Sequence, residues 1–141
     1  MENKEIKLNF LHICDYASFD QMGKLNILGL FETINSIQFP YQHPQFFVVA
    51  NLSISNSREY ECVIRIIDLD KIEINKFVLP KVKINLNKNQ SNTNLGIVGQ
   101  FNGVKFEKPG KYTIEVMVDG NVVDSKEITV IQVINKNAEK K

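Results

Sequence analysis

The 141-residue chain lacks most of the sequence features that identify a functional class. No apolar run approaches the roughly 18 residues that a membrane-spanning helix needs, and the first apolar stretch, Leu8 to Cys14, is interrupted by Asn9 and His12. The only cysteines, Cys14 and Cys62, form no CxxC pair and no disulfide framework. We therefore expect no membrane segment, no secretory leader and no zinc cluster, but a cytoplasmic protein with reduced thiols.

Residues for nucleophilic and phosphate chemistry are also scarce. The chain has two histidines and no Gly-x-Ser-x-Gly elbow, so no catalytic triad can be assembled from it. No glycine-rich run precedes a helix, as phosphate-binding loops require. The 17 basic and 16 acidic residues give a net charge of +1, which selects no class of partner. We predict a protein that is not an enzyme and has no catalytic, cofactor-binding or metal-binding residues.

What the sequence does contain is strand periodicity. Apolar residues, many of them β-branched or aromatic, recur at a period near two between clusters of Gly, Pro, Asn and Asp. This pattern predicts an all-β fold, an antiparallel two-sheet β-sandwich of about eight strands that is immunoglobulin-like or similar. One domain should span residues 1–134, followed by a solvated tail over 135–141. The predicted strands cover residues 8–14, 24–39, 46–54, 60–68, 72–86, 94–106, 112–118 and 122–133.

Glycine and proline indicate where these strands bend and end. Gly29, inside the long segment 24–39, suggests a bulge or a close backbone approach, and Pro40 and Pro44 should stop that strand. Pro80 should make 72–86 a broken or edge strand, because proline cannot donate to a β-ladder.

Two further expectations concern pairing. The polar link between segments 46–54 and 60–68 has hairpin length, so these two strands should pair antiparallel. Near the C-terminus, Tyr112 should be buried at the head of a strand that closes in a tight hairpin at Asp119-Gly120 or Gly120-Asn121.

His12 and Cys14 lie two residues apart, a spacing that could place two ligands on one metal ion, with Asp15 next in the chain. No third and fourth ligands lie nearby, and Leu8 and Phe10 share the same predicted strand face. Core packing is therefore the preferred interpretation of His12 and Cys14.

Aspartates pair at predicted strand ends and turns, where they could act as acid and base or converge on Ca²⁺. Such aspartates also accept hydrogen bonds from local backbone, and we favour this simpler role. His43, between two prolines, is predicted to be a loop residue that bonds backbone. The aspartate pairs are Asp15 with Asp20, Asp68 with Asp70, and Asp119 with Asp124.

Lysines are unevenly distributed. The segment from Asn75 to Phe106 contains five lysines and no acidic residue: Lys76, Lys81, Lys83, Lys88 and Lys105. With Phe77 and Phe101 it could form a basic, stacking face for single-stranded nucleic acid. Core positions for both phenylalanines and protection of an edge strand by lysine explain the pattern better, so nucleic acid is disfavoured.

Several blocks carry a family resemblance. The run Leu11-His12-Ile13-Cys14-Asp15-Tyr16-Ala17, followed by Gly23-Lys24-Leu25-Asn26-Ile27-Leu28-Gly29-Leu30-Phe31, resembles the opening of an uncharacterised bacterial family of short β-rich proteins. Four later segments resemble the other motifs of that family: Phe39-Pro40, His43-Pro44, Pro109-Gly110-Lys111-Tyr112 and Val118-Asp119-Gly120. That family has no assigned activity, so the resemblance implies the fold and transfers no functional residue.

The sequence thus favours a non-enzymatic protein-interaction or binding module. It would offer sheet edges or end loops to a protein partner, or sheet edges to a second copy of itself. One alternative is a sandwich that binds a small molecule, calcium or single-stranded nucleic acid. Another is a hydrolase whose active site cannot be recognised from the sequence.

Overall fold

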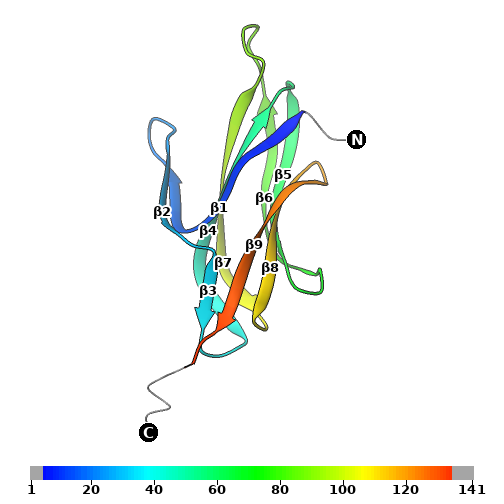
Figure 1. The fold of residues 1–141 in the computed structure, drawn as a ribbon. Helices are drawn as coiled ribbons and strands as arrows, with labels where there is room; N and C mark the ends of the chain where they lie inside the picture. The colour runs from blue at the N-terminus through cyan, green and yellow to red at the C-terminus, as the bar shows by residue number, and fades with distance from the viewer. Residues whose placement is uncertain (1–4, 135–141) are drawn as a thin grey trace.

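The computed structural model describes residues 5–134, which form nine β-strands and no helix (Figure 1). No helix in that range could therefore cross a membrane. The strands are β1 (Ile6–Phe19), β2 (Leu25–Leu30), β3 (Thr33–Ser36), β4 (Tyr41–Ile54), β5 (Arg58–Ile67), β6 (Glu73–Ile84), β7 (Thr93–Phe106), β8 (Gly110–Val118) and β9 (Asn121–Gln132). The predicted all-β class is confirmed, but the strand count is nine rather than about eight.

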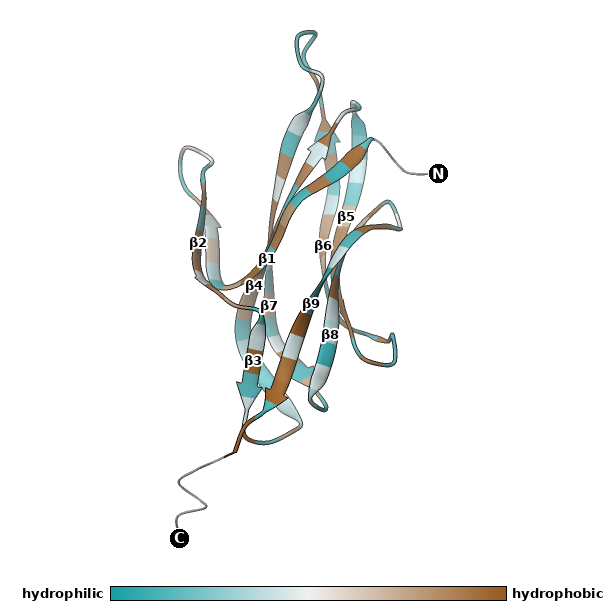
Figure 2. Cartoon of the chain, in the orientation of Figure 1, coloured by the Kyte–Doolittle hydropathy of each residue, from teal (hydrophilic) through white to brown (hydrophobic). Residues whose placement is uncertain are grey.

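The strands form two sheets. Sheet A has the order β2-β1-β4-β7 and sheet B the order β3-β9-β8-β5-β6, with every pairing antiparallel except β3 with β9. One apolar core lies between the sheets, and along β4 it takes alternate residues, including Phe46, Val48 and Leu52. Apolar and polar residues accordingly alternate along the ribbon (Figure 2). Burying each such large side chain contributes about 1.5–3 kcal/mol.

The predicted long strand over 24–39 is wrong: it is two strands in different sheets. The chain leaves sheet A after β2 and enters sheet B at β3, which pairs in parallel with the C-terminal β9. Gly29, whose φ is 71°, is the last residue but one of β2, just before the chain leaves sheet A. The apolar run Leu28-Gly29-Leu30-Phe31 continues through the break, which explains why the hydrophobic pattern alone conceals it. β1 continues to Phe19 instead of ending at Cys14 as predicted. The turn between β1 and β2 therefore begins at Asp20.

The predicted pairing of segments 46–54 and 60–68 is also wrong. β4 uses both of its edges for β1 and β7, whereas β5 lies in sheet B between β6 and β8. The short polar link between them crosses from one sheet to the other, and its length does not distinguish a crossing from a hairpin. Pro44 lies within β4 rather than ending a strand.

Other local predictions are confirmed. β6 is an edge strand whose pairing with β5 shifts register near Pro80. Asp119 and Gly120 have φ values of 51° and 83° in the β8–β9 turn, and Tyr112 is only 2% exposed. The predicted tail, residues 135–141, lies outside the described residues.

Candidate functional site

The β1–β2 hairpin covers the outer face of sheet A. The pairing of β1 with β4 ends at Cys14 opposite Phe47, and the rest of β1 pairs only with β2. A second apolar cluster fills the space beneath the hairpin, and the side chain of Phe19 lies directly over Gly96 of β7. This cluster contains Cys14, Ala17, Phe47 and Val49, with Phe10, Leu25, Ile27 and Val98 packed around them.

The hairpin also exposes apolar side chains, and one of them, Tyr16, meets Phe47 of the second cluster edge to face with ring centroids 5.2 Å apart. Tyr16 stands directly opposite Leu28 in the β1–β2 ladder, and Leu30 follows two residues along β2. Their side chains are 49%, 64% and 61% exposed, respectively. We call these three residues the hairpin patch. β2 stands at the margin of the molecule and is largely apolar (Figure 2).

β2 is also an unprotected sheet edge. Its sequence, Leu25-Asn26-Ile27-Leu28-Gly29-Leu30, has no charged residue and no proline. At the edges of sheet B, by contrast, β6 has Pro80 and exposed lysines, and β3 has only four residues. Short edges, lysine and proline are the usual protections against further strand addition. β2 has neither lysine nor proline.

A pocket of about 330 Å³ opens beside Leu30 of the patch. Gly29 makes room for the carboxylate of Asp15, because a Cβ at position 29 would collide with Asp15 Oδ2. We call this the Asp15 pocket. It is lined by Asp15, Gly29, Leu30, Phe31, Thr33, Ile34, Asn35, Tyr41 and His43.

His43 is a half-buried member of this pocket, and it lies in β4 rather than in the predicted loop. Its Nδ1 is 3.0 Å from the hydroxyl of Tyr41, and its ring packs against Phe31 and Phe46. Burial lowers the pKa of His43, although the charge of Asp15 opposes that shift. At neutral pH the imidazole is therefore uncharged, and a carboxylate is the charged group of the pocket lining.

A second pocket, of about 360 Å³, lies on the segment that joins β2 to β3 and is lined by His12, Ile13, Leu30, Phe31, Glu32 and Lys126. Its charges are paired with one another. Lys126 Nζ is 3.1 Å from Glu32 Oε1 and also donates to the Leu11 carbonyl at 3.3 Å. A site whose ions already satisfy each other offers little to a charged ligand.

The His12–Cys14 pair forms no metal site within the described residues, where no three His, Cys, Asp or Glu side chains come together. Cys14 is fully buried, which raises the pKa of its thiol, and His12 stacks on Phe10. The single strand face predicted for Leu8, Phe10, His12 and Cys14 is only partly right. A register shift between Leu8 and Phe10 puts Leu8 against the main core and Phe10 and Cys14 in the second cluster.

The turn role predicted for aspartates is confirmed at two positions. Asp20 accepts hydrogen bonds from the backbone amides of residues 22 and 24, and Asp68 from those of 70 and 72. Asp119 accepts from the Glu61 amide at 3.0 Å and pairs with Arg58 at 2.8 Å, whereas Asp124 accepts from the Ser125 amide. The carboxylates of Asp20, Asp68, Asp119 and Asp124 thus each have partners of their own.

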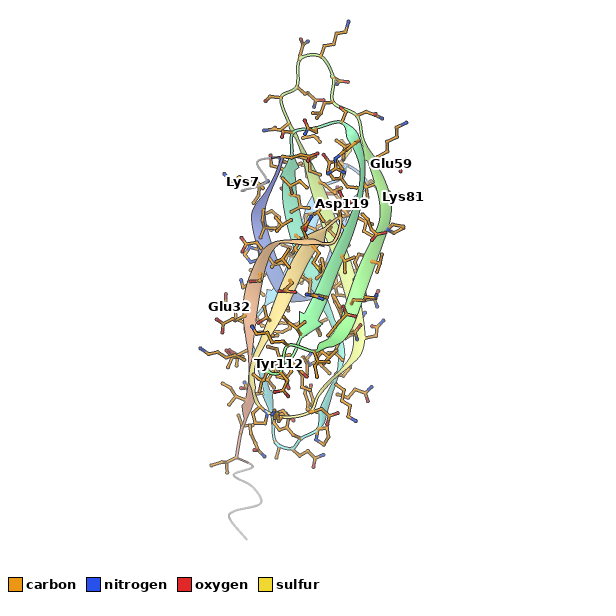
Figure 3. All side chains as sticks on the ribbon, turned by 90° about the vertical axis from the view of Figure 1, so that its right-hand side faces the viewer. Lys7, Glu32, Glu59, Lys81, Tyr112 and Asp119 are labelled. Atoms are coloured by element: carbon orange, nitrogen blue, oxygen red, sulfur yellow. The ribbon has the colours of Figure 1, made fainter. Side chains whose placement is uncertain are left out.

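The five lysines from Lys76 to Lys105 lie on different elements. Lys76, Lys81 and Lys83 lie on β6, Lys88 lies in the β6–β7 loop, and Lys105 is in sheet A, where it pairs with Glu107. Lys83 stands opposite Glu59 in the β5–β6 ladder. Lys81 and Glu59 lie at the same end of these two strands (Figure 3). Phe101 is buried and Phe77 packs against the main core, so neither is presented for stacking.

The sequence profile of a family of unknown function, DUF6941, matches residues 9–131. The chain belongs to this family. The DUF6941 match spans the hairpin patch and the Asp15 pocket but carries no assigned activity. No curated protein sequence matches the chain.

Two solved structures are similar to this DUF6941 protein. One is the Pseudomonas fluorescens alkylpurine DNA glycosylase AlkC bound to DNA containing an abasic-site analogue, with 12% identity and a TM-score of 0.55. That match covers 92% of this chain but 31% of AlkC, so the chain spans about a third of that protein's length. The other is an immunoglobulin-like protein from Pseudomonas aeruginosa, with 13% identity, 90% and 97% coverage and a TM-score of 0.40. At this identity the AlkC likeness concerns the fold alone.

Sequence reasoning did not find the Asp15 pocket as a unit. Its residues come from β1, β2, β3, β4 and the segment after β2, and only the crossing between sheets brings them together. The available signal was indirect: Asp15, Gly29 and His43 all lie in the blocks that carry the family resemblance. Tyr41 carries no signal of its own in the sequence, because the segment after Pro40 is predicted to be a loop.

Proposed function

We propose that this DUF6941 protein is a non-enzymatic interaction module that binds a protein partner through the β1–β2 hairpin. The observation that carries the proposal is the exposed apolar patch that Tyr16 of β1 forms with Leu28 and Leu30 of β2, an edge strand without charge or proline. Exposed apolar side chains grouped at one place are typical of interaction sites. A free edge adds backbone donors and acceptors, to which an extended segment of a partner can pair.

The hairpin is rigidly supported for this role. The second apolar cluster fixes its inner face on sheet A, so the patch is presented in one position before a partner arrives. Preorganisation of this kind reduces the entropy lost on binding. The partner is therefore expected to gain an added strand beside β2 and an apolar contact on Tyr16 and Leu28.

The alternatives have less support. A nucleic-acid role would need a continuous basic surface, and the five lysines lie on β6, in the β6–β7 loop and on β7 of the other sheet, where Lys83 stands opposite Glu59 and Lys105 pairs with Glu107. The AlkC likeness adds no argument for DNA, because it concerns the fold alone. A calcium role would need oxygens that Asp119 already commits to Arg58 and the Glu61 amide.

Site-specific photo-crosslinking tests the proposal. A benzophenone amino acid replaces Tyr16, and the protein is irradiated in the cells that make it. The matched control carries the same residue at Val122, a 48% exposed apolar position at the start of β9. We expect a discrete protein adduct at position 16 and none at position 122.

Leu28→Glu in the position-16 crosslinking variant should lower the adduct yield by about fivefold or more, as for loss of an interface hot spot. Its melting temperature should not change, because Leu28 is 64% exposed. Equal adducts at both positions, or a yield that Leu28→Glu leaves unchanged, would overturn the proposal.

A further inference from the structure

The Asp15 pocket combines one carboxylate with aromatic walls. Phe31 and Tyr41 contribute rings, and the neutral His43 contributes a third. Asp15 is exposed, and its carboxylate has no hydrogen-bond or ion-pair partner in residues 5–134, in contrast to Asp20, Asp68, Asp119 and Asp124. A carboxylate beside aromatic rings is the chemistry that recognises an organic cation, because both the charge and the ring faces attract positive charge.

The backbone at Gly29 keeps the pocket open for Asp15. A side chain at position 29 would collide with the Asp15 carboxylate, and the φ of 71° there is one that glycine adopts without strain. The adjoining pocket lacks this property, since Lys126 and Glu32 already neutralise each other in it. The unpaired negative charge is therefore specific to the Asp15 pocket.

We propose that the Asp15 pocket receives the cationic end of a lysine or arginine side chain from the protein partner that docks on β2. The inference rests on the proposed function, because Leu30 belongs to the hairpin patch and also lines the pocket. A partner segment that pairs with the β2 edge runs past Leu30 and can direct one side chain inward. Asp15 then accepts the charged hydrogen bond, while Phe31 and Tyr41 contact the aliphatic stem and the cation.

Binding of small probes tests this without the partner. The probes are the blocked amino acids N-acetyl-lysine methylamide and N-acetyl-arginine methylamide, and the neutral control is N-acetyl-norleucine methylamide. Amide resonances of ¹⁵N-labelled protein are followed during titration. We expect saturable shifts centred on Asp15, Gly29 and Leu30 with at least one cationic probe, and affinity at least about tenfold weaker for norleucine.

Asp15→Asn should weaken the cationic probe by about tenfold or more, as loss of a charge-assisted hydrogen bond implies. Asp70→Asn, which removes an exposed turn carboxylate outside the pocket, is the matched control and should leave the affinity unchanged. Equal binding of norleucine, an equal loss in Asp70→Asn, or no shift with either cation would overturn the inference. The crosslinking experiment uses a different readout, so failure of cation binding with a position-16 adduct condemns the pocket alone. Cation binding with no adduct condemns the proposed function, and with it the partner as the source of the cation.

Discussion

Tyr112 anchors the end of the main core through both its ring and its hydroxyl. The ring meets Phe106 edge to face with centroids 4.9 Å apart, and the hydroxyl donates to the Lys108 carbonyl at 2.6 Å. Tyr112→Ala should cost about 3–5 kcal/mol of unfolding free energy. Tyr112→Phe should cost about 1 kcal/mol, the worth of one hydrogen bond. Urea unfolding measures both, with the 49% exposed Tyr16 changed to Phe as the control. A loss below about 0.5 kcal/mol for Tyr112→Ala, a value typical of surface sites, would contradict this packing.

Gly29 faces both a steric and a conformational constraint. Gly29→Ala should destabilise by about 1–3 kcal/mol, because the new Cβ meets the Asp15 carboxylate and the φ is positive. Gly23→Ala measures the cost of the positive φ alone, because Gly23 has a φ of 80° and open space around it.

Unfolding free energies of Gly29→Ala, Asp15→Ala and the double variant complete the test. The double variant should be more stable than the sum of the single losses predicts, by about 1 kcal/mol, because Asp15→Ala removes the colliding atoms. Strict additivity would show that the collision is relieved elsewhere.

Glu5 is the carboxylate most strongly stabilised in its charged form. Hydrogen bonds from Arg58 and Tyr60 lower the pKa of Glu5 to about 2. A pKa below the unfolded value means that the stabilisation is complete above about pH 4.5 and is lost as the pH falls towards 2. Its size should be about 1–2 kcal/mol after solvent screening.

Unfolding free energies measured between pH 7 and pH 2 check this prediction. The wild type should lose more stability below pH 4.5 than Glu5→Gln does, whereas Glu127→Gln, at an exposed ion pair, should follow the wild type. Parallel curves for wild type and Glu5→Gln would contradict it.

At the scale of elements, adjacent residues of β4 serve different structures. Val48 and Val49 are both fully buried, but Val48 faces the core between the sheets and Val49 the cluster beneath the hairpin. Each change to Ala should cost about 2 kcal/mol. Hydrogen exchange should distinguish them: Val49→Ala should accelerate exchange mainly in β2, and Val48→Ala throughout both sheets. Identical exchange patterns would mean that the hairpin is not a separate unit.

These elements also show what the sequence could and could not predict. The C-terminal hairpin was predictable because Tyr112, Ile114 and Val116 alternate strictly and the Asp119-Gly120 turn is a local signal. The β2–β3 crossing was not, because an apolar run looks the same whether it stays in one sheet or moves to the other. The Asp15 pocket depends on that crossing, so its members were visible only as separate residues.

At the scale of the whole molecule, sheet B joins segments that are far apart in the sequence. β3, near the N-terminal third, pairs in parallel with β9, which also forms the hairpin with β8. β9 contributes the buried Ile128 and Val130 to the main core. Sheet B is therefore complete only when nearly the whole chain is present, and both sheets share one core.

Truncation tests this dependence. A chain ending at Gly120 lacks β9, which leaves β3 without a pairing strand, β8 with β5 alone and the core without two buried side chains. It should show no cooperative melting transition, since the lost burial is a large part of a marginal stability of about 5–15 kcal/mol. A chain ending at Ile134 removes only the predicted tail and should melt as the full-length protein does. Far-UV circular dichroism during heating measures both, with a strand spectrum expected for the full chain. Cooperative melting of the shorter chain within about 5 °C of the full-length value would show that β9 is dispensable and that the first eight strands hold the fold by themselves.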